Sequence, residues 1–154
     1  MSARFSISLA AIALATSAPA FAQACEGRQG AGMVRLAVEA TGLRNRAGEV
    51  AFTLYPDDRT RFLRGGGKLL RARIATQAPV TRACFWVRPG SYALAQYHDE
   101  NGDRDFNRSL VAPKEGFGFS NDAPTSIGLP SLKAARFTVP PRGLTMRMRM
   151  RYRR

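Results

Sequence analysis

The last stretch of the chain alternates without interruption between apolar and polar or charged side chains. Every second residue from Leu144 through three methionines to Tyr152 is apolar, and Arg147, Arg149 and Arg151 lie between them. A period of two places successive side chains on opposite sides of a β-strand. The stretch therefore predicts a strand with one buried face and one cationic face, which needs a sheet and a second layer to cover it.

Six further segments have strand-like patterns and are separated by turn residues. They are residues 34–39, 50–55, 69–76, 80–87, 92–98 and 134–139. We expect the first two to form a hairpin, and we find no internal repeat and no helical period beyond the N-terminal segment. The pattern predicts an all-β fold, an antiparallel immunoglobulin-like or transthyretin-like β-sandwich of about seven strands with one long ordered loop.

The first 24 residues have the pattern of a cleavable signal peptide. Arg4 precedes an apolar run over residues 5–15, and small residues follow as far as Ala24. As a helix this run would rise roughly 17 Å, well short of a ~30 Å hydrocarbon core. We therefore expect cleavage to leave one domain, residues 25–154, in the periplasm or outside the cell and not spanning a membrane.

Cysteine and histidine are too scarce for a zinc finger or a multi-histidine metal centre. The chain has two cysteines, Cys25 and Cys84, and a single histidine. In an oxidising compartment a pair of cysteines is most simply a structural disulfide. We expect Cys25 to pair with Cys84.

More than thirty residues after His98 lack strand alternation. A connection of this length in a compact domain is usually functional or disordered, and its aromatic, glycine and Asx residues favour order. Two phenylalanines are expected to anchor it on the sandwich. The residues expected to organise this ordered loop are His98, Glu115, Phe117, Phe119, Ser120 and Asn121.

Within this loop, every second position carries an oxygen-bearing side chain. The residues are Asp99, Asn101, Asp103, Asp105 and Asn107. This run resembles the start of a calcium loop, but Arg104 stands at the glycine position, and Glu115 could supply the missing carboxylate only if the loop folds back. The alternative is a set of Asx turns that cap their own backbone without metal. Calcium is the one cofactor considered, and no other is expected.

His98 lies beside Asp99, which could orient an imidazole that acts as a general base. With Glu115 these residues would form the centre of a hydrolase. No candidate nucleophile is close in sequence, since Ser109 and Ser120 are both distant. We therefore expect a non-catalytic module and keep two alternatives, the hydrolase and a calcium-stabilised binding module.

Four runs of sequence, TGLRNRAGEVAFTLY, RPGSYALAQYHDENGDRDFN, PKEGFGFSND and LPSLKAARF, occur in this order. They resemble the bacterial exported proteins of domain-of-unknown-function family 2141 over roughly residues 34–152. The resemblance implies a secreted or periplasmic β-sandwich with no established activity, and it supplies no catalytic residue. The family pattern has glycine at Arg104 and aspartate at Asn107, and both departures weaken the case for calcium in this chain.

The chain is strongly basic, with 24 Lys and Arg against 11 Asp and Glu and a net charge of +13. A charge of this size attracts polyanions. Because export removes the protein from most nucleic acid, we expect no nucleic-acid partner, and the available partners are anionic envelope polymers or lipid headgroups. The candidate binding residues are Arg147, Arg149, Arg151, Arg153 and Arg154. The alternative is a basic surface that only keeps the protein soluble.

Overall fold

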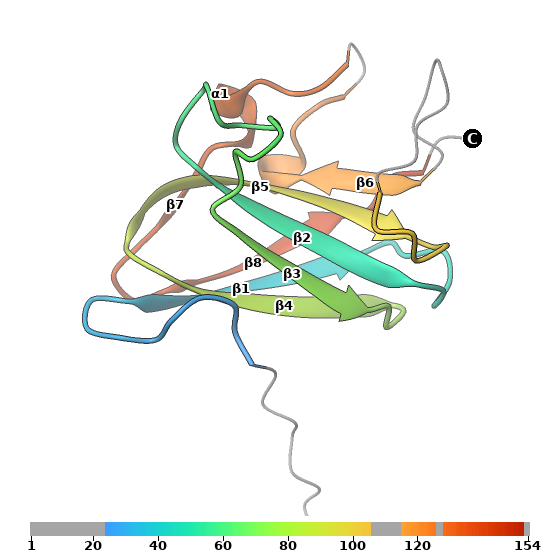
Figure 1. Cartoon of the computed structure of the whole chain (residues 1–154), viewed down its shortest axis with the longest axis horizontal. Coiled ribbons are helices and arrows are strands. Elements are labelled where there is room, and N and C mark those ends of the chain that lie inside the picture. The colour runs from blue at the N-terminus through green and yellow to red at the C-terminus, as the bar shows by residue number, and fades with distance from the viewer. Residues whose placement is uncertain (1–23, 106–114, 126–127, 153–154) are drawn as a thin grey trace, which may run out of the picture.

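The structure is a computed structural model that describes residues 24–105, 115–125 and 128–152. These residues form eight strands, a 3-10 turn and a four-residue helix (Figure 1). The strands are β1 (Val34–Thr41), β2 (Glu49–Pro56), β3 (Leu70–Ala75), β4 (Val80–Val87), β5 (Gly90–Asp99), β6 (Gly116–Phe119), β7 (Phe137–Val139) and β8 (Leu144–Arg149). The helical elements are η1 (Ser120–Asp122) and α1 (Leu132–Ala135).

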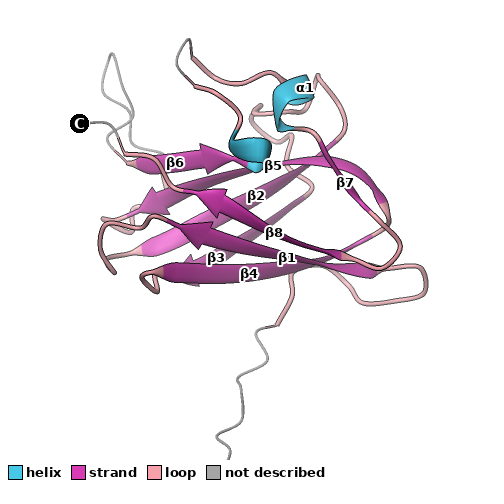
Figure 2. Ribbon diagram, turned by 180° about the vertical axis from the view of Figure 1, so that it is seen from behind, coloured by secondary structure: helices cyan, strands magenta, loops and turns pink. Residues whose placement is uncertain are grey.

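The strands form two sheets that face each other, which confirms the predicted all-β sandwich. One sheet has three strands in the order β4-β1-β8, and the other has five, in the order β3-β2-β5-β6 with β7 also paired to β5. Figure 2 shows the two layers from behind, with β1, β4 and β8 in the nearer one. Strands β6 and β7 share one edge of β5, because β2 occupies the other edge along most of its length.

Two pairings differ from the sequence-based prediction. The expected hairpin between the first two strands is wrong, because β1 pairs with β4 and β8 while β2 pairs with β3 and β5. The connection between β1 and β2 instead crosses from one sheet to the other. The second difference is that β1 and β8 are parallel, with Leu36 opposite Leu144 and Thr41 opposite Arg149. The sandwich is therefore mostly antiparallel, and its strand arrangement departs from the immunoglobulin type.

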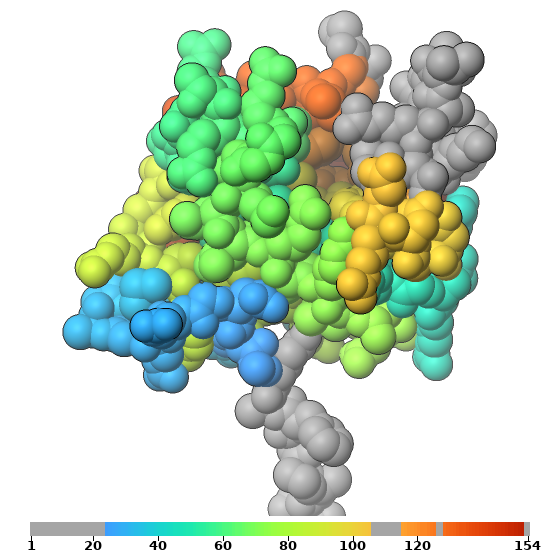
Figure 3. Space-filling view, viewed as in Figure 1, coloured from blue at the N-terminus to red at the C-terminus, as the bar shows by residue number. Residues whose placement is uncertain are grey.

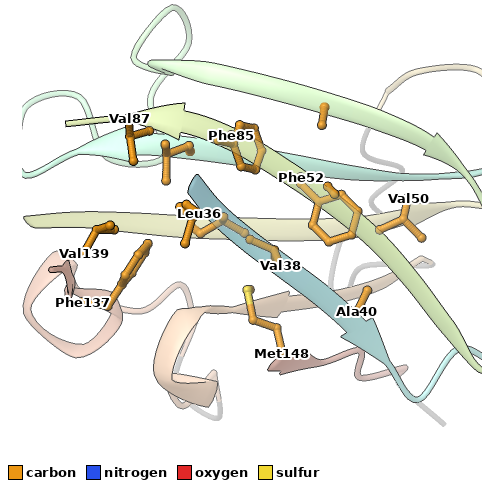
Figure 4. Close-up of a cluster of buried hydrophobic side chains, with 14 of the residues drawn as sticks. Leu36, Val38, Ala40, Val50, Phe52, Phe85, Val87, Phe137, Val139 and Met148 are labelled. Atoms are coloured by element: carbon orange, nitrogen blue, oxygen red, sulfur yellow. The ribbon is translucent and has the colours of Figure 1, made fainter. Parts of the chain in front are cut away.

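The core lies between the two inner faces and is built from the alternate residues that the strand patterns predict. Leu36, Val38, Phe52, Phe85 and Met148 are all completely buried in one cluster (Figure 4). Charged residues between them, as on β1 and β8, lie on the outer face. Burial of such apolar side chains is the main stabilising contribution in a domain of this size.

A second, smaller cluster covers part of the outer face of the five-stranded sheet. Tyr55 and Phe119 from the sheet pack with Phe62 and with Leu132 of α1. The predicted strand over residues 134–139 is wrong in its first part, because Ala134 and Ala135 belong to α1. The side chain of Ser131 accepts a hydrogen bond from the Ala134 amide and caps this single helical turn. The strand begins only at Phe137 and is three residues long.

The N-terminal segment is fixed to the three-stranded sheet. Cys25 and Cys84 form the predicted disulfide. The amide of Glu26 donates to the Cys84 carbonyl (2.9 Å), and the amide of Trp86 donates to the Glu26 carbonyl (2.8 Å). Figure 3 shows this segment in blue, on the same side of the molecule as the green β3. The segment is thus bonded to β4, the edge strand of this sheet, through one covalent link and two backbone hydrogen bonds.

The predicted signal peptide, residues 1–24, lies outside the described residues except for Ala24, where they begin. Its cleavage therefore stays a prediction. Across the described ranges, no helix has the length and apolar character needed to cross a bilayer.

Candidate functional site

The two residues at the end of β5 point in opposite directions. In the register of β5 with β2, His98 lies opposite the core residue Val50, whereas Asp99 lies opposite Glu49 on the outer face. Adjacent side chains on a strand alternate between faces, so Asp99 does not orient the His98 imidazole. The paired acid and base of the hydrolase alternative are therefore not brought together.

His98 is completely buried and has partners at both ring nitrogens. Its Nε2 donates to the Ala47 carbonyl (2.8 Å), and its Nδ1 shares a hydrogen bond of 2.6 Å with the Tyr152 hydroxyl. The guanidinium of Arg44 lies over the Tyr152 ring, 4.5 Å from the ring centroid, and also pairs with Glu100. These contacts connect β5 to the C-terminal residues and to the β1–β2 connection, which is a structural role.

Charge and burial shift the pKa values around this cluster. The hydrogen bond from Arg44 lowers the pKa of the Glu100 carboxyl, and Asn45 adds a second hydrogen bond in the same direction. Burial raises the pKa of the Tyr152 phenol. Both shifts keep the groups in the protonation states that their hydrogen bonds require at neutral pH.

Asp99 holds the turn that follows β5. Its Oδ1 accepts from the Gly102 amide and its Oδ2 from the Arg104 amide, both at 2.8 Å. The guanidinium of Arg73 donates to Oδ2 at 3.3 Å and to Glu49 at 2.6 Å. Asp99 is completely buried, and these three donors satisfy its charge.

Asn101 and Asp103 each form an Asx turn, in which the side-chain oxygen accepts from the backbone amide two residues further on. The side-chain oxygen of Asn101 accepts from the Asp103 amide (3.4 Å), and Asp103 accepts from the Asp105 amide (2.9 Å). All three residues are exposed. The Asx-turn alternative is thus formed over residues 99–105, while Asn107 lies outside the described residues.

The loop nevertheless folds back as a calcium site would require. One ligand atom from each of Asp99, Asp103 and Glu115 lies within 4.8 Å of the others, and Glu115 is buried. These three carboxylates are the described residues that could hold a metal. Of the residues predicted to bind calcium, Asp99 and Asp103 belong to this group of carboxylates and Asp105 does not, while Glu115 joins them from the far end of the loop.

The segment predicted to lack a strand contains β6, which pairs with β5. Phe117 and Phe119 lie on the outer face with ring centroids 6.1 Å apart, opposite Tyr97 and Ala95. Phe119 is buried in the second cluster, and Phe117 packs against it from a partly exposed position. Both rings hold the segment against the sandwich.

Ser120 and Asn121 fix the end of β6 to its neighbours. The Ser120 hydroxyl is buried, accepts from the Leu94 amide (3.0 Å) and donates to the Ala135 carbonyl. The Asn121 side chain donates to the Arg136 carbonyl at 2.6 Å. These bonds connect β5, η1 and α1, and the two residues stabilise the fold locally.

A second candidate site is the outer side of the three-stranded sheet, here called the arginine face. It carries four exposed arginines around a single acid, Glu39, which lies directly opposite Arg82 on β4 and Arg147 on β8. Glu39 pairs with both at 3.0 Å, and the hydrogen bond from Arg147, followed by that from Arg82, lowers the pKa of Glu39. The four arginines of this face are Arg35, Arg82, Arg147 and Arg149.

The predicted basic cluster of the C-terminus is divided by the structure. Arg147 and Arg149 lie on the arginine face. Arg151 does not, because its guanidinium donates to the backbone carbonyls of Asp122 (3.2 Å) and Ala123 (3.4 Å) and holds η1 in place. Arg153 and Arg154 lie outside the described residues.

A hollow of about 290 Å³ opens at one end of the arginine face. Arg35 of β1 and Arg142 of the β7–β8 connection line it together with Thr145, which lies opposite Ala37 in the strand register. Among the described residues neither arginine has an ion-pair partner. This pair was not predicted from the sequence, although Arg35 occupies an outward-facing position in the alternating pattern of its strand, which is a signal for it.

Fold and site together define a small β-sandwich with a basic face and an ordered acidic turn. The chain belongs to the family described as "Uncharacterized protein conserved in bacteria (DUF2141)", whose model matches residues 38–146. This match confirms the family resemblance found in the sequence. No curated protein and no solved structure matches the chain.

Proposed function

We propose that the chain is an exported, non-catalytic β-sandwich module that binds phosphate groups of anionic envelope components through its arginine face. The observation that carries the proposal is the hollow lined by Arg35, Arg142 and Thr145, in which both arginines lack an ion-pair partner within the described ranges. Guanidinium groups bind phosphate through paired, charge-assisted hydrogen bonds. Such a group therefore fits this hollow better than a neutral sugar would.

The rest of the arginine face extends the positive surface away from the hollow. Arg147 and Arg82 keep 71% and 62% of their side chains exposed although both contact Glu39. One acid neutralises one of these charges, so the face keeps a net positive charge. A surface of this kind attracts anions over about a Debye length, ~8 Å at physiological salt.

The location of the protein is part of the proposal. The N-terminal sequence pattern and the Cys25–Cys84 disulfide both support export to the periplasm or the cell exterior. In that compartment the abundant phosphate-bearing polyanions are lipid headgroups and phosphorylated envelope polymers, so nucleic acid is not the expected partner.

Two alternatives have less support from the geometry. A hydrolase would need an accessible general base, and His98 is buried with both ring nitrogens bonded. A calcium-stabilised module would need Asp99 to exchange its two backbone amides and Arg73 for the ion.

Vesicle co-sedimentation tests the proposal and separates the possible sources of phosphate. The purified protein is mixed with phosphatidylglycerol vesicles, with lipopolysaccharide and with neutral phosphatidylcholine vesicles. We expect binding to one or both phosphate-rich surfaces that weakens as salt is raised, and none to phosphatidylcholine. Binding to neither of the two anionic surfaces at low salt would overturn the proposal.

Matched double variants separate a built site from net charge. Arg35→Gln with Arg142→Gln removes the hollow's charges, whereas Arg59→Gln with Arg64→Gln removes two exposed arginines that do not line it. We expect the first pair to weaken binding at least about tenfold, as expected for loss of charge-assisted hydrogen bonds, and the second to change it less than about twofold. Equal weakening by both pairs would show that only net charge acts and would refute the site.

A further inference from the structure

The outer face of the five-stranded sheet carries a second hollow, which is unrelated to the arginine face. It has a volume of about 160 Å³, and its lining includes Tyr55, Leu63, Arg71, Tyr97 and Phe119. We call it the aromatic pocket. It lies on the opposite side of the sandwich from the arginine face, because the two sheets face each other through the core.

The strand register explains why the sheet is hollow at this point. Arg71, Thr53, Ala95 and Phe119 lie side by side across β3, β2, β5 and β6. The two central residues, Thr53 and Ala95, are small, while the residues at both ends are large. Neighbouring strands are ~4.8 Å apart, so this row forms a trough with a guanidinium at one end and a phenyl ring at the other.

The next row along the sheet has the same plan but is filled. It consists of Arg73, Ala51, Tyr97 and Phe117. Here Tyr97 replaces the alanine of the first row, and its ring centroid lies 5.6 Å from the Arg73 guanidinium. Its hydroxyl accepts from Arg73 at 2.7 Å, so an aromatic ring from β5 occupies the place that is open in the first row.

The two arginines also differ in their acidic partners. Arg73 pairs with the carboxylates of Glu49 and Asp99. Arg71 donates from Nε to the Thr53 hydroxyl at 2.9 Å, and within the described ranges it pairs with no carboxylate. A partly buried guanidinium without a counter-charge favours an anion beside it.

Two further features at the pocket indicate a surface that is shaped for a ligand. Leu63 has a left-handed backbone with φ of 56°, a conformation that is strained for a bulky side chain. Leu129 is 60% exposed, the most exposed of the large apolar side chains that the structure describes. Both residues line the pocket, so an apolar occupant would cover them.

We propose that the aromatic pocket binds a small aromatic carboxylate. The ring of the ligand lies over Ala95, between Arg71 and Phe119, in the position that Tyr97 takes in the next row. Its carboxylate pairs with Arg71, as Glu49 pairs with Arg73. One ligand thereby supplies both the ring and the charge that the neighbouring row obtains from its own residues.

Benzoate is the probe that tests this proposal, with benzamide as its neutral counterpart and hexanoate as a carboxylate without a ring. Binding is measured by amide chemical-shift changes in the purified protein. We expect benzoate to shift the amides of residues around Arg71 and Phe119 in a saturable way and to bind at least about tenfold more tightly than either of the other probes. Equal binding of benzamide would refute the role of the charge, and equal binding of hexanoate would refute the role of the ring.

Two variants act on the pocket in different ways. Arg71→Gln removes the charge, and Ala95→Leu fills the trough while leaving Arg71 unchanged. Both should weaken benzoate binding at least about tenfold, whereas Arg59→Gln, outside the pocket, should leave it unchanged. Unaltered binding in a folded Ala95→Leu protein would overturn the proposal even if Arg71→Gln fails to fold. The arginine-face variants leave this pocket intact, so the two proposals fail independently.

Discussion

Replacing Gly118 by alanine should destabilise the protein, because β6 packs its backbone directly against the C-terminal strand. A Cβ atom added at Gly118 would lie 2.4 Å from the carbonyl oxygen of Arg149, whereas ordinary contact begins at 3.4 Å. The clash is with backbone, which cannot rotate away, so β6 and β8 must separate by roughly 1 Å. Overpacking of this kind costs about 1–3 kcal/mol, which corresponds to about 4 °C in Tm for each kcal/mol in a domain of this size.

Urea unfolding followed by circular dichroism measures this change. Gly65→Ala is the matched control, because nothing lies within 4 Å of its added Cβ atom, and its stability should stay within about 0.5 kcal/mol of the parent protein. Gly116→Ala provides a second comparison, and it should also lower the stability, because its added Cβ atom would meet the Tyr152 ring at 2.3 Å. If Gly118→Ala unfolds at the same urea concentration as Gly65→Ala, the packing of β6 on β8 is not as described.

Two other predictions concern the disulfide and the acidic turn. Replacing Cys25 and Cys84 by alanine should lower the free energy of unfolding by about 4 kcal/mol, from closure of a loop with a sequence separation of 59; a loss under about 1 kcal/mol in urea unfolding would contradict this. Thermal unfolding should have the same midpoint in calcium and in chelator, because Asp99 is already bonded to two backbone amides and Arg73. A rise in the midpoint of several degrees with calcium would instead show that Asp99, with Asp103 and Glu115, holds the ion.

The strands can be predicted from the sequence because their side chains alternate between a buried and an exposed face. Val34 to Glu39 and Leu144 to Arg149 show the predicted phase in the structure. Their pairing cannot be predicted in the same way, since alternation says which face is buried and not which strand is adjacent. The short turn-like sequence after Thr41 indicates a hairpin, yet it serves equally well to cross between sheets.

Strand β6 escapes prediction because its inward positions are Gly116 and Gly118. These residues have no side chain to contribute to an apolar pattern, so the alternation in this strand is visible only as phenylalanine against glycine. Glycine is required at these two positions because Tyr152 approaches Gly116 closely and Arg149 approaches Gly118, and both of these residues are distant in sequence. A long-range contact of this kind leaves no local signal.

The candidate sites can be predicted only in part for the same reason. The oxygen-rich turn after His98 is local in sequence, and its Asx turns are one of the two expected forms. The partners of that turn, Arg73 and Glu115, come from other parts of the fold. The hollow of Arg35 and Arg142 likewise exists only once β1 and β8 lie side by side.

The parallel pairing of β1 with β8 has a consequence for how the protein is made. β1 is the middle strand of its sheet, and one of its two neighbours is β8, with a hydrogen bond between Thr41 and Met148 that spans 107 positions. A nascent polypeptide therefore cannot complete this layer until β8 has been synthesised, and contacts of such long range form slowly. For the export proposed above, a translocation channel that accepts only extended chains would have that interval in which to move the polypeptide before it folds.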